Sequence, residues 1–204
     1  MAAKRQRGER AGITRAQVLD KALELVDRVG LGGLTMRALG AELGVEAMTL
    51  YHYVPNKDAL IDGLVERVFT AATPAAAGDD WREHLRAYAH ELRMLLLEHP
   101  GVLPVIVRPA ATPATLDAVE TGLQVLTGAG FRLGTALDAI NTLTLFVISH
   151  TAAEVAIGET APPPLDAERH PLLLAAATTN AGGDDFTRFA FAVEALLTGF
   201  DEAR

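Results

Sequence analysis

The chain has 204 residues, of which 50% are hydrophobic and 22% are charged, and this composition fits one or two globular domains rather than a mainly disordered chain. It contains no cysteine, so disulfide scaffolds, thiolate zinc sites and cysteine nucleophiles are excluded. The net charge is −8, but residues 1–57 hold nine of the 18 Lys and Arg and only six of the 26 Asp and Glu, so that part carries +3 and the remainder −11.

The uneven charge predicts a first domain that meets a polyanion, with a chance distribution of surface charge as the alternative. The first ten residues are basic, but no apolar run follows them, so they do not resemble a secretory signal. The most apolar stretch, 139–153, is shorter than a membrane span and contains polar residues. We therefore expect a cytoplasmic protein with no membrane partner.

Hydrophobic residues recur at helical spacing along almost the whole chain, and no segment alternates in the manner of a strand. The first helix is expected between an N-cap at Thr14 and a stop at Gly30. Four later helices are expected around residues 81–95, 113–128, 137–151 and 186–200, with breaks at 71–80, 158–166 and 182–185. Thr112 is expected to be the N-cap of the second of these helices, with Pro113 as its first residue. The predicted fold class is all-α, with an N-terminal domain at 12–71 and a larger helical domain at 72–204.

The segment 34–60, LTMRALGAELGVEAMTLYHYVPNKDAL, predicts two short helices around a tight turn. Thr35 is expected to cap the first helix, Gly44 to end it, and Val45 to begin the second, with the small Gly40 where the two helices cross. The residues expected near the core are Met36, Leu39, Leu43, Met48 and Leu50. Together with the helix before it, this unit would form a three-helix helix-turn-helix domain.

In a helix-turn-helix unit the second short helix enters the major groove, and its early residues face base edges. Here those residues are Glu46, Ala47, Met48 and Thr49, of which Ala47 and Met48 are apolar and could contact a thymine methyl group. Asn56 is expected to cap the next helix and to place Lys57 in its first turn. The free N–H groups of that turn and the lysine would bind a phosphate.

Residues 12–69 resemble the DNA-binding domain of the tetracycline-repressor (TetR) family of bacterial transcriptional regulators. The resemblance lies in ITRAQVLDKALELVDRVG, LGGLTMRALGAELGV and, most specifically, TLYHYVPNKDAL. Beyond this domain, DDWREHLRAYAHELR, VRPAAT, LDAVETGLQVLTGAGF and the final helix resemble the ligand-binding domain of the tetracycline repressors themselves.

The resemblance implies a set of DNA contacts on these residues. Arg37 would reach a base edge or a phosphate, Thr49 a base or phosphate, and Tyr51 and Lys57 the phosphate backbone, with His52 or Tyr53 packed beside Tyr51. The alternative for Tyr51 and Tyr53 is that both only seal the small helical core. The basic arm of Lys4, Arg5, Arg7 and Arg10 would either enter a minor groove or remain an idle tail.

The C-terminal domain is expected to enclose a mostly apolar effector pocket. Its expected lining comes from the helices around 81–95 and 137–151 and, for Leu103 and Val119, from the helices between them, and consists of Tyr88, Leu92, Leu103, Val119, Leu137, Ile140 and Asn141. Solid core at these positions is the alternative. The apolar segment 139–153 and the stripe Phe186, Phe189, Val193, Leu196 and Phe200 offer more apolar surface than one domain buries, and the resemblance implies an isologous four-helix interface between two copies.

No metal or other cofactor is expected. Tetracycline repressors hold a magnesium–drug complex through a histidine shortly before an Arg-Pro pair and a glutamate on a later helix, but the matching positions here are Pro104 and Ala153. His150 and Glu154 stand four residues apart on one helix, a spacing compatible with a metal, although a surface or pocket-lining pair is favoured. No catalytic constellation is recognisable, so an enzyme is not expected.

The predicted function is therefore a DNA-binding transcriptional regulator. We expect a repressor that binds double-stranded operator DNA as a homodimer and leaves it when a small apolar molecule binds. Two alternatives remain open from the sequence: a small-molecule carrier or enzyme that retains a vestigial helix-turn-helix, and an activator or a regulator without a ligand.

Overall fold

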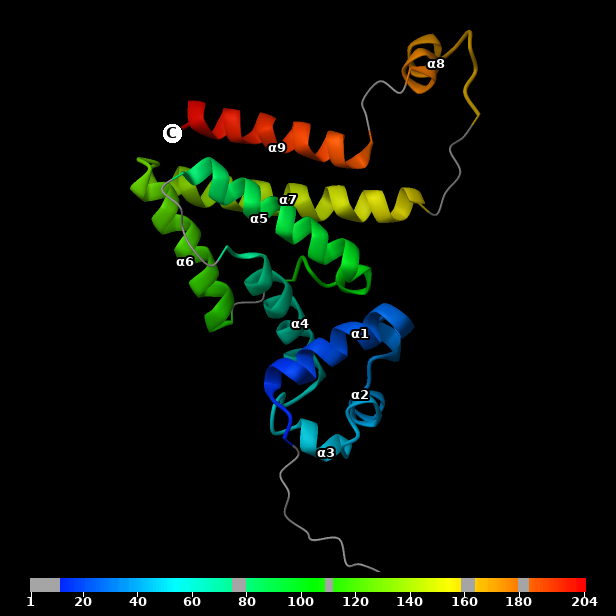
Figure 1. Ribbon diagram of the computed structural model, residues 1–204, viewed down its shortest axis with the longest axis vertical. Helices are drawn as coiled ribbons and strands as arrows, with labels where there is room; N and C mark the ends of the chain where they lie inside the picture. The colour runs from blue at the N-terminus through cyan, green and yellow to red at the C-terminus, as the bar shows by residue number, and fades with distance from the viewer. Residues whose placement is uncertain (1–11, 75–79, 109–111, 159–163, 180–183) are drawn as a thin grey trace, which may run out of the picture.

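The computed structural model describes residues 12–74, 80–108, 112–158, 164–179 and 184–204, and these residues form helices without any strand, so the all-α prediction is confirmed (Figure 1). In chain order the elements are α1 (Arg15–Gly33), α2 (Met36–Leu43), α3 (Ala47–Leu50), α4 (Lys57–Ala72), α5 (Trp81–Glu98), the short 3₁₀ helix η1 (Pro100–Val102), α6 (Pro113–Gly128), α7 (Leu133–Gly158), α8 (Pro171–Thr178) and α9 (Asp185–Glu202). Helix α8 was not expected from the sequence, and none of its residues is buried.

Helix starts follow the predicted caps. Thr14, Thr35, Asn56 and Thr112 each accept a hydrogen bond from the backbone N–H three residues later, at 3.2, 3.1, 2.8 and 3.3 Å. Such a bond satisfies one of the N–H groups that a helix leaves unpaired at its start. The expected stop at Gly30 is a kink instead: with φ 70° and ψ 169° this glycine interrupts α1, and three more residues follow before the helix ends.

The crossing of α2 and α3 requires a glycine at position 40. A Cβ atom added there would lie 2.8 Å from the Val45 carbonyl oxygen, closer than side chains tolerate. Gly44 ends α2 in the left-handed conformation, with φ 67°. Leu39 and Leu50 are fully buried between the helices, whereas Met48, predicted near the core, is 70% exposed. That expectation was wrong because α3 begins at residue 47 and spans only four residues, so only Leu50 turns inward.

The larger domain is a layered bundle in which α5 packs against α6, α7 and α9, and α6 and α9 pack against α7 (Figure 1). Helix α4 packs against α1 on one side and against α5 and α6 on the other, so it connects the two parts of the molecule. The predicted apolar stripe of α9 is used in part within the chain: Phe189 and Val193 are buried, Leu196 and Phe200 are partly buried, and Phe186 remains exposed.

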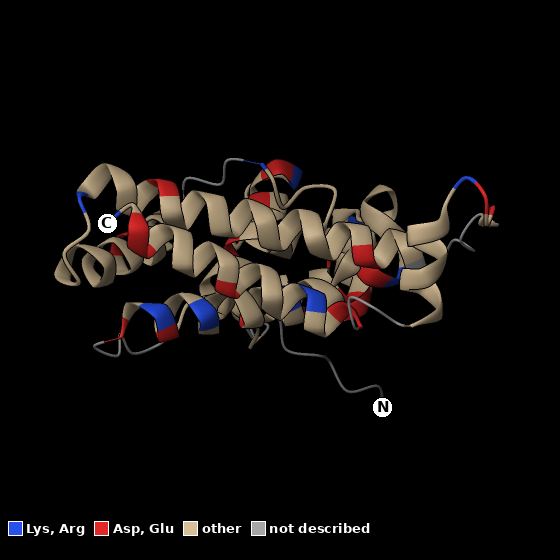
Figure 2. Ribbon diagram, turned by 90° about the horizontal axis from the view of Figure 1, so that it is seen from above, with Lys and Arg blue, Asp and Glu red and all other residues tan. Residues whose placement is uncertain are grey.

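Helix α7 is longer than the apolar segment expected from the sequence. Residues Leu133–Ile157 are long and apolar enough to span a membrane by length and composition, the one such helix among the described residues. Its two charged residues, Asp138 and Glu154, stand far apart, and long uncharged stretches of helix, drawn in tan, are visible in Figure 2. However, Leu143, Val147 and Thr151 are fully buried. Packing against α5, α6 and α9 makes α7 the core helix of the larger domain.

One buried ion pair joins α5 to α7. The Arg93 guanidinium donates two hydrogen bonds to the Glu154 carboxylate, at 2.7 and 3.1 Å, and the two side chains are 7% and 16% exposed. Arg93 also lies over the Phe189 ring, 5.2 Å from its centroid. A charge in such a place is tolerated only while its partner is present.

Removing that partner is expected to destabilise the fold strongly. Glu154→Ala leaves the Arg93 guanidinium buried without a counter-charge, and we expect a loss of about 3–5 kcal/mol in the free energy of unfolding. Urea unfolding followed by circular dichroism, at one protein concentration, measures it.

Glu194→Ala is the matched control, because Glu194 makes the same two-bond pair with Arg86 on the surface, where the side chains are 54% and 38% exposed. Its loss should be below about 1 kcal/mol. Equal losses in the two variants would contradict the assignment of Arg93–Glu154 as a buried pair.

Candidate DNA-binding surface and ligand pocket

The predicted DNA contacts gather at the end of the molecule formed by α2, α3 and the start of α4 (Figure 1). Their side chains are exposed or half-buried: Arg37, Met48, Tyr51, His52 and Lys57 are exposed, and Ala47 and Thr49 are intermediate. Asn56 caps α4, so Lys57 is its first residue, as predicted. The Lys57 ammonium donates to the Leu31 carbonyl at 3.3 Å, which holds the side chain beside the end of α1.

Tyr51 and Tyr53 have different environments. Tyr51 is 43% exposed, whereas Tyr53 is partly buried and packs against the core. The alternative in which both rings only seal the core therefore fits Tyr53 and does not fit Tyr51. The Tyr51 hydroxyl is free to reach outward from the turn that follows α3. The basic arm of residues 4–10 lies outside the described residues.

The cations of residues 12–74 fall into two groups. Four of the six described there are in ion pairs: Arg15 with Glu66, Lys21 with Glu24, Arg28 with Glu42, and Arg67 with Asp20. The two that lack an ion pair with another described residue are Arg37 and Lys57, both on the predicted DNA-binding surface. The paired carboxylates are neutralised in turn, and the Arg15 guanidinium lowers the pKa of Glu66.

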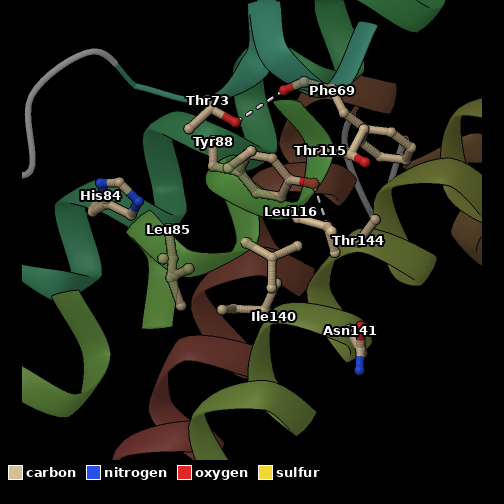
Figure 3. A pocket seen from close by; sticks show the side chains of 13 residues that line it. Phe69, Thr73, His84, Leu85, Tyr88, Thr115, Leu116, Ile140, Asn141 and Thr144 are labelled. Carbon is tan, nitrogen blue, oxygen red and sulfur yellow. Dashed lines mark hydrogen bonds between the residues drawn. The ribbon is translucent and has the colours of Figure 1, made fainter. Parts of the chain in front are cut away.

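A cavity of about 360 Å³ opens where α4, α5, α6 and α7 meet (Figure 3). Thirteen residues line it: Phe69, Thr73, His84, Leu85, Tyr88, Thr115, Leu116, Ala118, Val119, Gly122, Ile140, Asn141 and Thr144. Four of the seven residues predicted for the effector pocket are among them, namely Tyr88, Val119, Ile140 and Asn141. A volume of this size is typical of small-molecule sites.

The other three predicted residues do not line this cavity. Leu92 is one helical turn beyond Tyr88 and is fully buried in the core. Leu137 is one turn before Ile140 on α7 and is 41% exposed. Leu103 lies in the turn after η1, not on a helix as expected, and packs against the core from there. Helical spacing found the correct faces of α5 and α7 but not where along them the cavity ends.

Among the described residues, the cavity wall carries no full charge, because none of the thirteen is Asp, Glu, Lys or Arg. Burial lowers the pKa of His84, which favours the neutral imidazole. Burial also raises the pKa of Tyr88 to about 12, so its phenol stays protonated. The Tyr88 hydroxyl lies 3.0 Å from the Thr144 hydroxyl, and either can donate. The site is thus apolar, with a few neutral hydrogen-bonding groups.

His150 and Glu154, the two residues of α7 whose spacing is compatible with a metal, contact other side chains in the structure. Glu154 is bound by Arg93, and the His150 ring lies 5.4 Å from both the Phe146 and the Phe189 rings. Among the described residues, no group of three or more His, Asp or Glu side chains could hold a metal ion. Pro104 and Ala153, which stand where tetracycline repressors are expected to carry metal-site residues, are both exposed and outside the cavity.

The cavity and the DNA-binding surface share helix α4. Phe69 and Thr73, at the end of α4, line the cavity, and Lys57 begins the same helix. A second contact joins the two parts, because Asp27 of α1 accepts hydrogen bonds from Nδ1 of His99 at 2.7 Å and from the backbone N–H of Gly101 at 3.1 Å. The larger domain is therefore attached to the first domain at two places, through α4 and through the contacts of Asp27 on α1.

Known proteins resemble the chain along most of its length. A family model described as bacterial regulatory proteins, tetR family, matches residues 18–64, and one described as tetracyclin repressor-like, C-terminal domain, matches residues 73–204. The tetracycline repressor protein class D of Escherichia coli is 33% identical over 201 residues, which cover 94% of this chain and 90% of that protein.

Two further similarities come from Streptomyces. The HTH-type transcriptional repressor DrrR1 of Streptomyces coeruleorubidus is 31% identical over 221 residues, with 96% of this chain and 80% of that protein covered. The crystal structure of the TetR family protein ActR of Streptomyces coelicolor, in complex with actinorhodin, matches with a TM-score of 0.74 at 25% identity, covering 94% of this chain and 98% of that one.

Proposed function

The chain belongs to the TetR family of bacterial regulatory proteins, and we propose that it is a cytoplasmic repressor that leaves its operator when an uncharged small molecule fills the cavity beside α4. The observation that carries the proposal is that one helix bears both Lys57 and two cavity residues, Phe69 and Thr73. We assign DNA binding to residues 12–71 and effector binding and dimerisation to residues 72–204. The matched ranges 18–64 and 73–204 support this division.

The proposed DNA contacts divide by chemistry. Tyr51 and Lys57 reach phosphates, Arg37 reaches a base edge or a phosphate, and Lys57 adds its charge to the free N–H groups at the start of α4. Thr49, with Ala47 and Met48 beside it, faces base edges, where an apolar side chain meets a thymine methyl group. The remaining residue of the set, His52, packs beside Tyr51. The support for the set is its exposure on one surface and the absence of ion pairs at Arg37 and Lys57.

Lys57→Ala should weaken binding to every DNA duplex alike, because a phosphate contact carries no base information. We expect the slope of log K against log salt to become shallower by about 0.9, the value for one lost phosphate contact. Fluorescence anisotropy with one arbitrary labelled duplex over a salt series measures this without knowledge of the operator.

Lys21→Ala is the matched control, since it removes the same charge from a lysine that is paired with Glu24 on α1. Its salt slope should equal that of the wild type. If Lys57→Ala and Lys21→Ala behave alike, the assignment of Lys57 is wrong. If the chain were a small-molecule carrier or an enzyme with a vestigial helix-turn-helix, neither the wild type nor the two variants would show salt-dependent DNA binding.

We also propose that two copies pair through α7 and α9. These helices pack side by side, and each keeps large apolar side chains exposed, including Leu145 at 57% and Phe191 at 77%. Two helices from each copy would form an isologous four-helix interface. The dimer would then present two DNA-binding surfaces to two half-sites.

Phe191→Glu should give a monomer, because the interface would bury an unpaired carboxylate. Light scattering at micromolar concentration measures the mass. Met94→Glu is the control, since Met94 is 58% exposed on α5, outside the proposed interface, and this variant should remain a dimer. A dimeric Phe191→Glu protein would count against α9 as part of the interface.

The effector is proposed to act through α4. A ligand that favours one tilt of this helix changes the distance between the two DNA-binding surfaces of a dimer and so its match to the operator. Linkage then requires DNA to weaken the ligand by the same factor by which the ligand weakens DNA. The crystallised complex of ActR with actinorhodin shows that a relative of this fold binds an organic molecule.

Release from DNA should need no metal, because the described cavity lining offers one imidazole and no carboxylate, and no group of three or more such side chains that could hold a metal is found among the described residues. A screen of uncharged aromatic compounds against a protein–operator complex, with the operator selected from random duplexes, should give the same release with magnesium and with EDTA. Release by tetracycline that disappears on addition of EDTA would overturn the metal-free assignment.

A further inference from the structure

His84 is a buried polar residue of the larger domain. It lies on α5, is 6% exposed, and forms part of the cavity wall (Figure 3). Its Nδ1 atom is buried and has no hydrogen-bond partner among the described residues. A buried polar atom without a partner destabilises a fold, and an apolar side chain of similar size would avoid this. The unpartnered atom therefore needs an explanation, and the position of His84 in the cavity wall allows a ligand to supply one.

A second hydrogen-bonding group lies one helical turn further along the same face of α5. Tyr88 follows His84 by four residues, which is a rise of about 6 Å along the helix axis. Its hydroxyl is 3.0 Å from that of Thr144 on α7. Two hydroxyl groups hold two donors and four acceptor positions, and their mutual bond uses one of each. The pair therefore keeps a donor and acceptors for a ligand.

The rest of the wall determines what lies between these two polar groups. Leu85, Leu116, Val119 and Ile140 contribute aliphatic surface from α5, α6 and α7, and Phe69 adds an aromatic ring from α4. None of the described lining residues is Asp, Glu, Lys or Arg, and burial lowers the pKa of His84 and so favours its neutral form, so the charge of a carboxylate, sulfonate or ammonium group would meet no counter-charge. An ionised ligand would lose its hydration here without compensation, which is strongly unfavourable.

We propose that the ligand of this cavity is an uncharged ring compound with hydroxyl or carbonyl oxygens at two positions on one edge. One oxygen hydrogen-bonds the His84 imidazole, and the other joins the Tyr88–Thr144 hydroxyl pair. The apolar rings lie against the aliphatic wall. This assignment rests on the proposed function, in which the cavity is the effector site, and makes His84 a residue that determines which effectors bind.

Matched naphthalene compounds test the proposal by direct calorimetric or fluorescence titration of the purified dimer without DNA. The probe 2,7-dihydroxynaphthalene carries both oxygens on one edge, its 2,6 isomer carries them on opposite edges, naphthalene has none, and naphthalene-2,7-disulfonate is ionised. We expect the 2,7-diol to bind about tenfold more tightly than the 2,6 isomer or naphthalene, because only it satisfies both polar groups. The disulfonate should not bind.

Variants then separate His84 from the rest of the fold. His84→Phe replaces the imidazole by an aromatic ring of similar size without nitrogen atoms. It should reduce the affinity for the 2,7-diol about tenfold, while naphthalene binds at least as well. His90→Phe is the control: His90 is on the same helix, packs against Phe186 and Phe189 and does not line the cavity, so it should leave both affinities unchanged. Thermal unfolding of each variant checks the fold, and retained naphthalene binding shows an intact cavity.

The outcomes distinguish this inference from the proposed function. Equal affinities for the three uncharged probes, an undiminished affinity in His84→Phe, or no binding of the 2,7-diol overturns the inference, even if other apolar compounds release DNA. Conversely, a 2,7-diol that binds through His84 but does not change operator affinity supports the inference and overturns the proposed effector role of the cavity.

Discussion

Helix α4 is packed on two sides at once, and both halves of the molecule depend on this constraint. Its seven buried residues, Leu60, Ile61, Gly63, Leu64, Val65, Val68 and Ala72, cover roughly 200° of its circumference at about 100° per residue. A helix that covers one core usually buries a stripe about half as wide. Because α1 holds one side and α5 and α6 the other, the position of Lys57 and the shape of the cavity cannot change independently.

Charged side chains are arranged differently in the two halves of the molecule. In residues 12–74 the ion pairs occupy four cations and leave Arg37 and Lys57 on the surface formed by α2, α3 and the start of α4. None of the described residues that line the cavity is charged, and the buried ion pair Arg93–Glu154 lies outside that lining. Unpaired positive charges therefore lie on the surface that would meet a polyanion, whereas the described cavity wall offers only uncharged groups to a ligand.

Much of the fold could be predicted because its signals are local. Thr14, Thr35, Asn56 and Thr112 cap helices in the structure as predicted, since a cap depends on a side chain and an N–H group only three residues apart. Gly40 and Gly44 likewise have the roles expected from their size and freedom of φ. Met48 was misplaced because a four-residue helix is too short for its spacing to define an inward face.

The sequence by itself determined the all-helical class, the family resemblance and the surface that carries Arg37 and Lys57, because each depends on neighbouring residues. Only the tertiary structure decided the cavity. Tyr88, Val119, Ile140 and Asn141 could be predicted from apolar helix faces. Phe69, Thr73 and His84 could not, because their place in the cavity wall depends on how α4 and α5 cross. Leu92 is on the expected face of α5 but is buried in the core beyond the cavity. The hydrophobic period of a helix specifies which of its faces is buried. A cavity forms where packed helices leave space unfilled, and this depends on their arrangement in three dimensions.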